Sequence, residues 1–314
     1  MTTDSQPAGA VDEAAQEPLP PACVMTFNAS DASGAGGIAG DVCTIAAMGA
    51  HALPVVASIV MRDTAEVFDQ HAIDPDAVVE QARGILEDAT ISAWKVGFLG
   101  TAEGVSAVAE VLSDYPDVPL VAYMPSLSWM EEDQLQSYLD AFRELVLPQT
   151  EVLIGNHKTL TDFLLPDWDS ERPASARELA VAAAEQGTRF VLVTGMLLPA
   201  KGSEQFIDNV LASADGAITG EKFERFETAF VGAGDTLSAA LASLLAAGSE
   251  LSAAVGEALQ FLDQSLDSGF RPGMGNVVPD RFFWALPPGE EEEEVAEGTE
   301  PQDDDSAGTP RRVH

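Results

Sequence analysis

Apolar runs and amphipathic segments alternate along most of this 314-residue chain. Short runs rich in Val, Ile and Leu have the length of buried strands, and the stretches between them repeat apolar residues with a helical period. Strands and helices that alternate in this way indicate right-handed β-α-β units, which build a mostly parallel sheet with helices on both faces. We predict strands at 22–28, 52–61, 92–97, 118–123, 151–155 and 189–195, and helices at 35–49, 75–88, 103–113, 131–146, 174–186, 233–247 and 250–268.

The stretch 205–228 breaks this alternation. Its short apolar pieces are separated by Gly and Asp, so we predict two or three antiparallel strands at one edge of the sheet. No internal repeat is visible, and a single α/β domain at 22–287 fits the pattern better than two domains. The flanking segments 1–21 and 288–314 are rich in acidic residues and Pro and are predicted to be disordered acidic tails.

The formal charge of −37 makes polyanionic binding partners unfavourable for this chain. Both the body of the chain and its ends carry the acidic excess. Such a surface repels phosphate backbones and anionic lipid, so neither nucleic acid nor a membrane surface is expected as a partner. It can serve solubility or reflect a salt-rich cytoplasm, and the second explanation predicts loss of stability at low ionic strength.

Cysteine usage and hydropathy bear on the compartment. Cys23 and Cys43 give neither a disulfide framework nor the spacing of a metal site, and packing explains both. The N-terminal segment lacks a basic-then-apolar signal pattern, and no apolar run approaches the length needed to span a bilayer. We therefore expect a cytoplasmic protein. The histidines share no ligand-like spacing, so no metal held by protein side chains is expected.

A first glycine-rich turn, residues 28–37 (NASDASGAGG), follows the first strand and opens into a helix. Its G-x-G-x-x-A spacing matches a dinucleotide fingerprint, with Asp63 after the next strand as the acidic partner. The turn is longer than that motif requires, and Asp63 lies beyond the usual spacing. A tight turn in which Asp31 or Ser33 caps the following helix is the alternative.

A second glycine-rich turn, Gly232-Ala-Gly-Asp235, opens into an alanine-rich helix late in the chain. Asp235 can simply be the N-cap of that helix. The same geometry also suits phosphoryl transfer, because the amides of residues 232–235 meet the positive end of the helix dipole and can bind an anion. The Asp235 carboxylate would then accept the proton of an alcohol. Two such turns in one domain suggest two polar or anionic groups held near each other.

These motifs resemble the ribokinase-like superfamily, and within it the hydroxymethylpyrimidine/phosphomethylpyrimidine kinases of thiamine biosynthesis. Residues 26–41 (TFNASDASGAGGIAGD) are similar to the family's first-strand motif, roughly T-x-A-x-S/T-D-P-x-G-G-A-G-x-x-A-D. The second turn is similar to the family's G-[ST]-G-C-T. Residues 48–54, 94–99, 147–148 and 269–275 also look familial, so the resemblance runs through nearly all of 22–286.

The resemblance implies a three-layer α/β/α ribokinase-like fold and ATP-dependent phosphorylation of a primary alcohol on a pyrimidine, with magnesium bridging the ATP phosphates. A second phosphorylation, of the monophosphate, is also implied, and homodimers are common in the family. The catalytic residues would be Asp235 with Gly232, Ala233 and Gly234. The substrate would lie against Ala29, Asp31, Gly36, Asp41, Arg62 and Phe98, and the nucleotide against Asn156, Thr194, Gly195 and Thr236.

The sequence departs from the family at several polar positions. The family's catalytic-loop Cys is Asp235 here, as in ribokinases, which restores a base. The Gln that holds the pyrimidine is Arg62, and because Arg offers donors only, an anionic or acceptor-only substrate would suit it better than a neutral ring edge. Three motifs around ATP and metal are eroded, at 123–126, 156–159 and 194–197. These losses leave open a non-catalytic paralogue that binds a small molecule without efficient transfer.

Two further polar residues have open roles. Asp41, in the first turn of its helix, is either a partner of the helix dipole or a ligand of the substrate hydroxyl. Lys95 sits at a strand end, where we expect a packing or edge role.

Overall fold

The structure, a computed structural model, describes residues 20–200, 202 and 205–285. Nearly all of the tails predicted at 1–21 and 288–314, and the last two residues of the domain predicted at 22–287, lie outside these ranges. The domain limits and the disorder of the tails therefore stay predictions. In the described ranges no helix combines the length and the apolar character that crossing a membrane requires.

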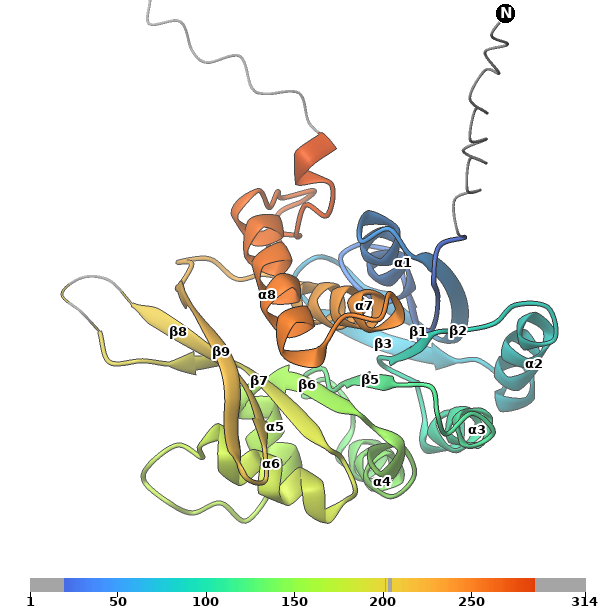
Figure 1. The fold of residues 1–314 in the computed structure, drawn as a ribbon, viewed down its shortest axis with the longest axis horizontal. Helices are drawn as coiled ribbons and strands as arrows, with labels where there is room; N and C mark the ends of the chain where they lie inside the picture. Colours follow the sequence, from blue (N-terminus) through green and yellow to red (C-terminus); the bar gives the residue numbers. More distant parts are fainter. Residues whose placement is uncertain (1–19, 201, 203–204, 286–314) are drawn as a thin grey trace, which may run out of the picture. The chain divides into compact units, whose positions relative to one another are not determined.

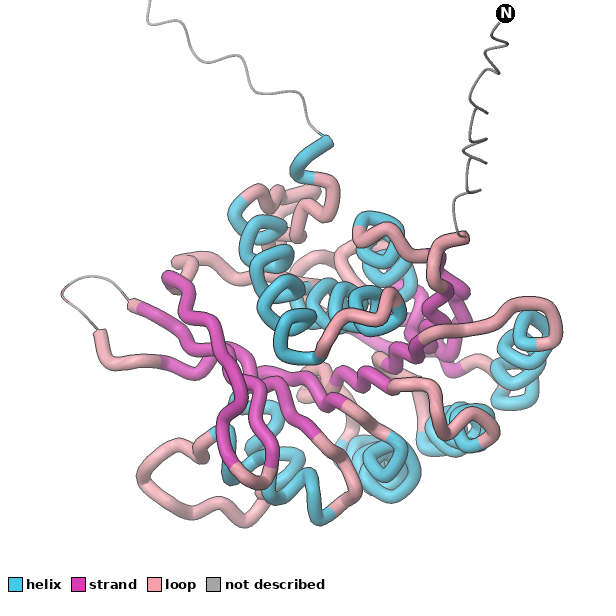
Figure 2. Tube along the Cα trace, viewed as in Figure 1, coloured by secondary structure: helices cyan, strands magenta, loops and turns pink. Residues whose placement is uncertain are grey.

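One sheet runs through the middle of the described chain (Figure 1, Figure 2). Its strands are β1 (Cys23–Asp31), β2 (His51–Arg62), β3 (Val67–Ala72), β4 (Ala93–Val96), β5 (Leu120–Tyr123), β6 (Val152–Asn156), β7 (Phe190–Leu197), β8 (Phe206–Ser213) and β9 (Gly216–Glu224). The spatial order is β3-β2-β1-β4-β5-β6-β7-β8-β9. The six strands from β2 to β7 in this order pair in parallel, whereas β3, β8 and β9 are antiparallel to their neighbours.

Helices cover both faces of this sheet (Figure 1). On one face lie α1 (Gly37–Ala47), α7 (Ala233–Ala246) and α8 (Leu251–Asp267). The other face carries α2 (Pro75–Leu86), α3 (Ala102–Ser113), α4 (Glu132–Ala141), α5 (His157–Leu164) and α6 (Ala176–Glu185). A wide helical turn at Phe142–Val146 extends α4 and is followed by a tight helical turn at Leu147–Gln149. Another tight helical turn, Phe283–Ala285, comes after α8. The predicted three-layer α/β/α arrangement is confirmed.

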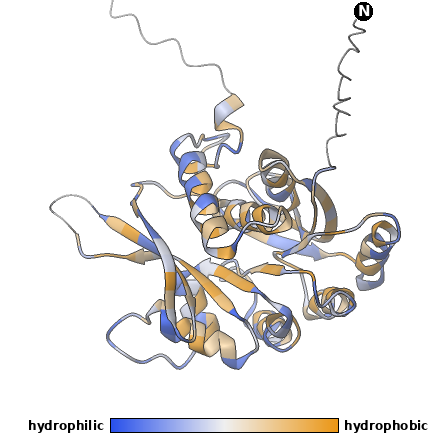
Figure 3. Cartoon of the chain, in the orientation of Figure 1, coloured by the Kyte–Doolittle hydropathy of each residue, from blue (hydrophilic) through white to orange (hydrophobic). Residues whose placement is uncertain are grey.

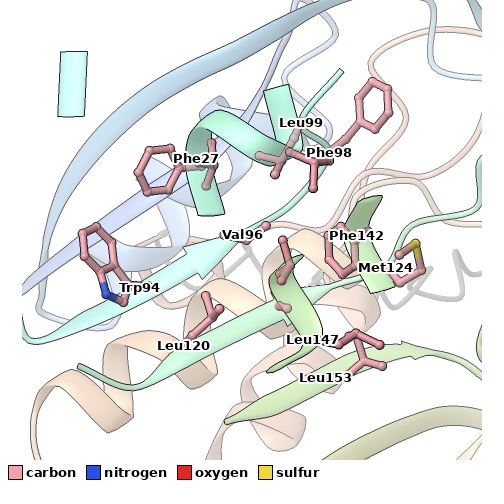
Figure 4. Packing of buried hydrophobic residues seen from close by; sticks show 14 of the residues in the cluster. Phe27, Trp94, Val96, Phe98, Leu99, Leu120, Met124, Phe142, Leu147 and Leu153 are labelled. Carbon is pink, nitrogen blue, oxygen red and sulfur yellow. The ribbon is translucent and has the colours of Figure 1, made fainter. Parts of the chain in front are cut away.

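Each face of the sheet has its own apolar core. The central strands β4 and β5 are buried on both faces, which is why they read as unbroken apolar runs in the sequence. Hydrophobic residues run along the central strands in Figure 3. Figure 4 shows the core on the α2–α6 side, where the rings of Phe27 and Trp94 lie 5.8 Å apart between their centroids. The second core lies between the sheet and α1, α7 and α8.

All the predicted strands and helices are present, and their ends shift by no more than about three residues, except that α4 ends at Ala141 and the wide helical turn completes the helix predicted to 146. The antiparallel edge predicted at 205–228 is confirmed as β8 and β9. A second antiparallel pairing, of β2 with β3 at the opposite edge, is absent from the sequence prediction. Strand β3 reads VFDQHA and no residue in it is buried, so it lacks the apolar alternation that reveals a strand. Helix α5 is also unpredicted, because only Leu160 and Phe163 are buried in it.

Parallel pairing fixes where polar side chains gather. Strands β1, β4 and β5 run in the same direction, so the residues that follow them meet at one edge of the sheet. That edge receives Asp31 at the end of β1, Phe98 just after β4 and Tyr123 at the end of β5. The crevice at the carboxyl ends of the strands is the usual ligand position in open α/β sheets.

Candidate active site

The two glycine-rich turns lie in contact with each other. Gly37 N donates a hydrogen bond to Asp235 Oδ2 over 3.1 Å. A Cβ atom on Gly36 would lie 2.5 Å from the same oxygen. A Cβ atom on Gly232, whose φ is +87°, would lie 1.6 Å from the carbonyl oxygen of Ala35. Gly232 therefore has no room for a side chain against the first turn, and a side chain on Gly36 would displace the Asp235 carboxylate.

Asp31 organises the first turn. Its Oδ1 accepts hydrogen bonds from the Ser33 backbone N and Oγ, and its Oδ2 accepts one from Gly36 N. Helix α1 has Gly36 as its N-cap, without a side-chain cap, so the alternative of a cap from Asp31 or Ser33 is wrong. The Gly37 amide is engaged by Asp235 and is not free to bind a dinucleotide phosphate, which argues against the fingerprint interpretation.

Asp235 lies in the first turn of α7, and its carboxylate points toward β1 and β4. The N-cap of α7 is Gly232 and no side chain caps the helix, so the interpretation of Asp235 as a simple N-cap is wrong. Asp235 Oδ1 accepts hydrogen bonds from Lys95 Nζ and Asn28 Nδ2, each over 2.8 Å. Oδ2 accepts from Gly37 N and retains capacity for one more donor. The side chain is 16% exposed and lines a cavity.

Lys95 and Asp41 lie beneath Asp235, with both side chains fully buried. Lys95 Nζ is 2.8 Å from Asp41 Oδ1 and 2.8 Å from Asp235 Oδ1. Asp41 Oδ2 also accepts hydrogen bonds from Thr26 Oγ1 and Asn28 Nδ2. The edge role expected for Lys95 is wrong, because β4 has a neighbour on each side, whereas its packing in the core is confirmed. Its buried ammonium is in addition paired with two carboxylates. Asp41 does not line the cavity, and its contact with a substrate stays a prediction.

Ion pairing sets the charges of this cluster. Burial by itself would lower the pKa of Lys95, but Asp235 and Asp41 raise it above its ordinary value. At Asp235 burial is outweighed by Lys95, Asn28 and Gly37, which hold the pKa of the carboxyl below its ordinary value. Burial raises the pKa of Asp41, against the opposing effect of Lys95. Asp235 is thus held in its ionised form where it lines the cavity.

The cavity beside Asp235 has an aromatic wall and a polar floor. The rings of Phe98 and Trp129 meet edge to face with their centroids 5.5 Å apart. Of the predicted substrate-binding residues, Ala29, Asp31, Arg62 and Phe98 line the cavity, whereas Gly36 and Asp41 do not. The full lining is Asn28, Ala29, Asp31, Gly37, Val60, Arg62, Val67, Phe98, Tyr123, Pro125, Ser126, Leu127, Trp129 and Asp235.

Arg62 brings positive charge to the cavity from the end of β2. Its side chain is 15% exposed, and its Nη1 lies 3.7 Å from Asp31 Oδ2. Its Nε donates to the Asp63 carbonyl oxygen, which fixes the plane of the guanidinium. The cavity therefore presents an arginine donor edge near Asp31 and a carboxylate at Asp235.

Tyr123, at the end of β5, opens the segment 123–126, where the sequence departs from the resembled family. Its ring lies against the N-terminal turn of α7, since a Cβ atom on Gly234 would come within 2.2 Å of Tyr123 Cζ. The ring centroid is 5.9 Å from Lys95 Nζ. Burial and the neighbouring Asp235 raise the pKa of the phenol, so Tyr123 stays neutral. The acidic group beside this phenol is thus Asp235 of α7.

The predicted nucleotide-binding residues divide into two places. Asn156, the last residue of β6, is the register partner of Thr194 in the middle of β7, and Gly195 follows Thr194 with φ +71°. Asn156 Oδ1 accepts from Thr159 N and so caps α5. Thr236 is buried in α7, and its hydroxyl donates to the Gly232 carbonyl oxygen. None of the four lines the cavity, and their contact with a nucleotide stays a prediction.

Arg281 is a residue of the site that sequence reasoning does not identify. Its side chain is buried, its Nε donates to Thr236 Oγ1 over 3.0 Å, and its Nη2 donates to the Ala35 carbonyl oxygen. It thereby ties the second turn to the first. No sequence motif identifies Arg281. Asn28 is also missing from the predicted site residues, but it could have been found, because the resembled first-strand motif has Ala at that position.

Comparison with known proteins bears on the identity of this site. The sequence matches the phosphomethylpyrimidine kinase family over residues 31–280. It is 30% identical over 258 residues to the hydroxymethylpyrimidine/phosphomethylpyrimidine kinase of Haemophilus influenzae, covering 81% of this chain and 94% of that protein. It is 28% identical to the Streptomyces coelicolor protein of the same name, with coverage of 86% and 97%. The chloroplastic bifunctional thiamine biosynthetic enzyme TH1 of Arabidopsis thaliana is 30% identical, and the chain spans only 46% of its length.

Solved structures agree on the fold. The ADP complex of Bacillus subtilis pyridoxal kinase superposes with a TM-score of 0.72 at 22% identity, over 85% of this chain and all of that one. The phosphomethylpyrimidine kinase of Clostridium difficile gives 0.61 at 21% identity, over 77% and 98%. The predicted ribokinase-like fold is therefore confirmed. With the family match covering most of the sequence, this chain belongs to the phosphomethylpyrimidine kinase family and is a small-molecule kinase.

Proposed function

We propose that this protein transfers the γ-phosphoryl group of ATP to the hydroxymethyl group of a pyrimidine, hydroxymethylpyrimidine and its phosphate, in thiamine biosynthesis. Family membership supports the reaction class. The observation that carries the mechanism is the ionised Asp235 carboxylate, which faces a cavity from the first turn of a helix. The alternative, a non-catalytic paralogue, is favoured by the eroded segments at 123–126 and 156–159, and the ring of Tyr123 in the first of these lies against that turn.

We propose a task for each part of the site. The substrate ring lies in the aromatic cavity, with its alcohol toward Asp235 Oδ2, which takes the proton as the alcohol attacks. The amides of Ala233, Gly234 and Asp235 have no partner within α7, and the positive end of the helix favours the charge that develops on the phosphoryl group. Arg62 binds an acceptor on the substrate ring.

ATP and magnesium fit this site in different ways. The free N-terminal amides of α7 suit the ATP phosphates. Within the described ranges no three His, Cys, Asp or Glu side chains come together to hold a metal. We therefore propose that magnesium arrives bound to the ATP phosphates, where it neutralises their charge.

Replacement of Asp235 tests the proposal. Asp235→Ala is expected to lower turnover of hydroxymethylpyrimidine with magnesium-ATP by about 10²–10⁴-fold, the usual contribution of a general base. The fold should persist, because Asp41 still balances the buried charge of Lys95. Asp215→Ala, in the exposed turn between β8 and β9, is the matched control. Unchanged turnover in Asp235→Ala would eliminate the proposed role.

Calorimetric titration separates the kinase from the non-catalytic paralogue. The kinase binds magnesium-ATP, whereas the paralogue binds the pyrimidine but not the nucleotide. A cytoplasmic location and a homodimer are further proposals from the resemblance. Cell fractionation and sedimentation velocity test them.

A further inference from the structure

Lys95 is the one buried lysine among the three in the described ranges. A buried ammonium is costly unless carboxylates pair with it and its N–H groups are bonded. Lys95 Nζ lies 2.8 Å from Asp41 Oδ1, 3.0 Å from Asp41 Oδ2 and 2.8 Å from Asp235 Oδ1. The Lys95 ammonium is therefore held in place by the carboxylates of Asp41 and Asp235.

Asn28 supports the same carboxylates from β1. Its Oδ1 accepts hydrogen bonds from the backbone N atoms of Ala29 and Phe98, at 2.9 and 3.0 Å. A carbonyl oxygen must face those two donors, so the amide nitrogen is turned toward the acids. Asn28 Nδ2 then lies 2.8 Å from Asp235 Oδ1 and 3.0 Å from Asp41 Oδ2.

We propose that Lys95 and Asn28 are positioning residues that saturate Asp235 Oδ1, so that only Oδ2 is presented to the substrate alcohol. The inference rests on the proposed function. In the transfer step the alcohol oxygen forms a bond to the γ-phosphorus, and its proton passes to Asp235 Oδ2. The bond from that phosphorus to the bridging oxygen of ATP breaks, and its electron pair leaves with ADP.

Asp41 has a complementary part in this arrangement. When Asp235 takes the proton it becomes neutral, and Lys95 loses one of its two anionic partners. Asp41 remains 2.8 Å from Lys95 Nζ, so no unpaired cation is left in the core. The second carboxylate therefore lets Asp235 change its charge during the reaction at little cost to the fold.

Other charged and titratable groups also face Asp235. Tyr123 approaches from β5, Arg281 from the segment after α8, and Asp31 and Arg62 from across the cavity. None of them is altered when Lys95, Asn28 or Asp41 is replaced. We call the hydrogen bonds from Lys95 and Asn28 to Asp235 Oδ1 the clamp. A change in the titration of Asp235 in such variants therefore reports the loss of the clamp.

The double variant Asp41→Asn/Lys95→Met is the informative test. Lys95→Met alone would leave two carboxylates buried without a cation, whereas the double variant removes one charge of each sign. We expect kcat for hydroxymethylpyrimidine to fall about 10²-fold, as for a misplaced catalytic group, with KM changed less than about threefold. Because Lys95 lowers the pKa of Asp235, its loss should move the acid limb of the kcat–pH profile to higher pH.

Two variants complete the experiment. Asn28→Ala keeps Lys95 and is expected to shift the acid limb in the same direction by a smaller amount, so it also serves if the double variant does not fold. Lys222→Met, on the exposed side of β9, is the control for loss of a lysine. A fall in kcat with an unmoved acid limb, or a wild-type kcat, would overturn the positioning role.

The outcome at Asp235 distinguishes the two proposals. If Asp235→Ala keeps its turnover, the proposed function fails and the positioning role fails with it. If Asp235→Ala is inactive while the clamp variants keep the wild-type acid limb, the positioning role alone is overturned.

Discussion

Gly36 and Asp235 are complementary in size: the carboxylate oxygen Oδ2 occupies the space next to which a Gly36 side chain would begin, 2.5 Å from the Cβ position. The resembled family has Ala at the first of these positions and Cys at the second. This chain therefore combines a smaller residue, Gly36, on the first turn with a larger one, Asp235, on the second. The carboxylate on α7 is thus accommodated by a change on the opposite turn.

Gly36→Ala should therefore impair turnover more than it impairs the fold. The added methyl group must push Asp235 Oδ2 away from the cavity, and small overpacking changes cost about 1–3 kcal/mol in the free energy of unfolding. Displacement of a catalytic group by about 1 Å can cost on the order of 10²-fold in kcat. Steady-state kinetics and urea denaturation measure the two effects. Gly256→Ala on α8, where no atom lies within 4 Å of the added Cβ, is the matched control. Wild-type kcat in Gly36→Ala would refute the size match.

Arg62→Gln is expected to lower the KM for hydroxymethylpyrimidine about tenfold, since one added hydrogen bond of roughly 1.4 kcal/mol corresponds to that factor. Glutamine offers a donor and an acceptor to the ring edge, whereas Arg62 offers donors only. The KM for a ring carrying an anionic substituent should rise in the same variant. If the two values of KM move together, Arg62 does not choose between substrates.

Arg281→Met should destabilise the domain and loosen the site. The substitution keeps most of the apolar stem but removes the bonds to Thr236 and Ala35, and a hydrogen bond to a charged group contributes about 1.5–3 kcal/mol. The midpoint of urea unfolding should fall by the corresponding amount. Arg177→Met, at the exposed start of α6, controls for loss of an arginine. Equal midpoints for the two variants would show that Arg281 does not clamp the turns.

The sequence predicts the sheet well because its central strands are buried on both sides. Strands such as β4 and β5 must be apolar throughout, and the intervening helices must be amphipathic, so both leave a periodic signal. Strand β3 leaves none, because it lies at an edge with no buried residue. An apolar pattern in the sequence reveals a strand only when helices or strands bury its side chains. Strand β3 is held by its backbone pairing with β2 alone, which leaves no such pattern.

The residues of the site likewise divide into those that a local sequence pattern reveals and those that it does not. Asp235 and the glycines are visible in the sequence because a tight turn before a helix demands particular residue types. The roles of Lys95 and Arg281 depend on contacts with residues far away in the chain, and no local pattern encodes them. Asp235 itself illustrates the limit: the sequence allows it to be a helix cap, and only the approach of β1 and β4 shows where its carboxylate points.

The contact between Arg281 and Ala35 spans 246 residues. During synthesis the first turn leaves the ribosome long before the arginine that will hold it, so the two glycine turns stay unjoined until almost the whole domain has emerged. Closure of so long a loop comes late and slowly in folding. Premature termination after α7 but before that arginine would yield a chain with its whole sheet and both glycine turns, yet without the residue that joins them.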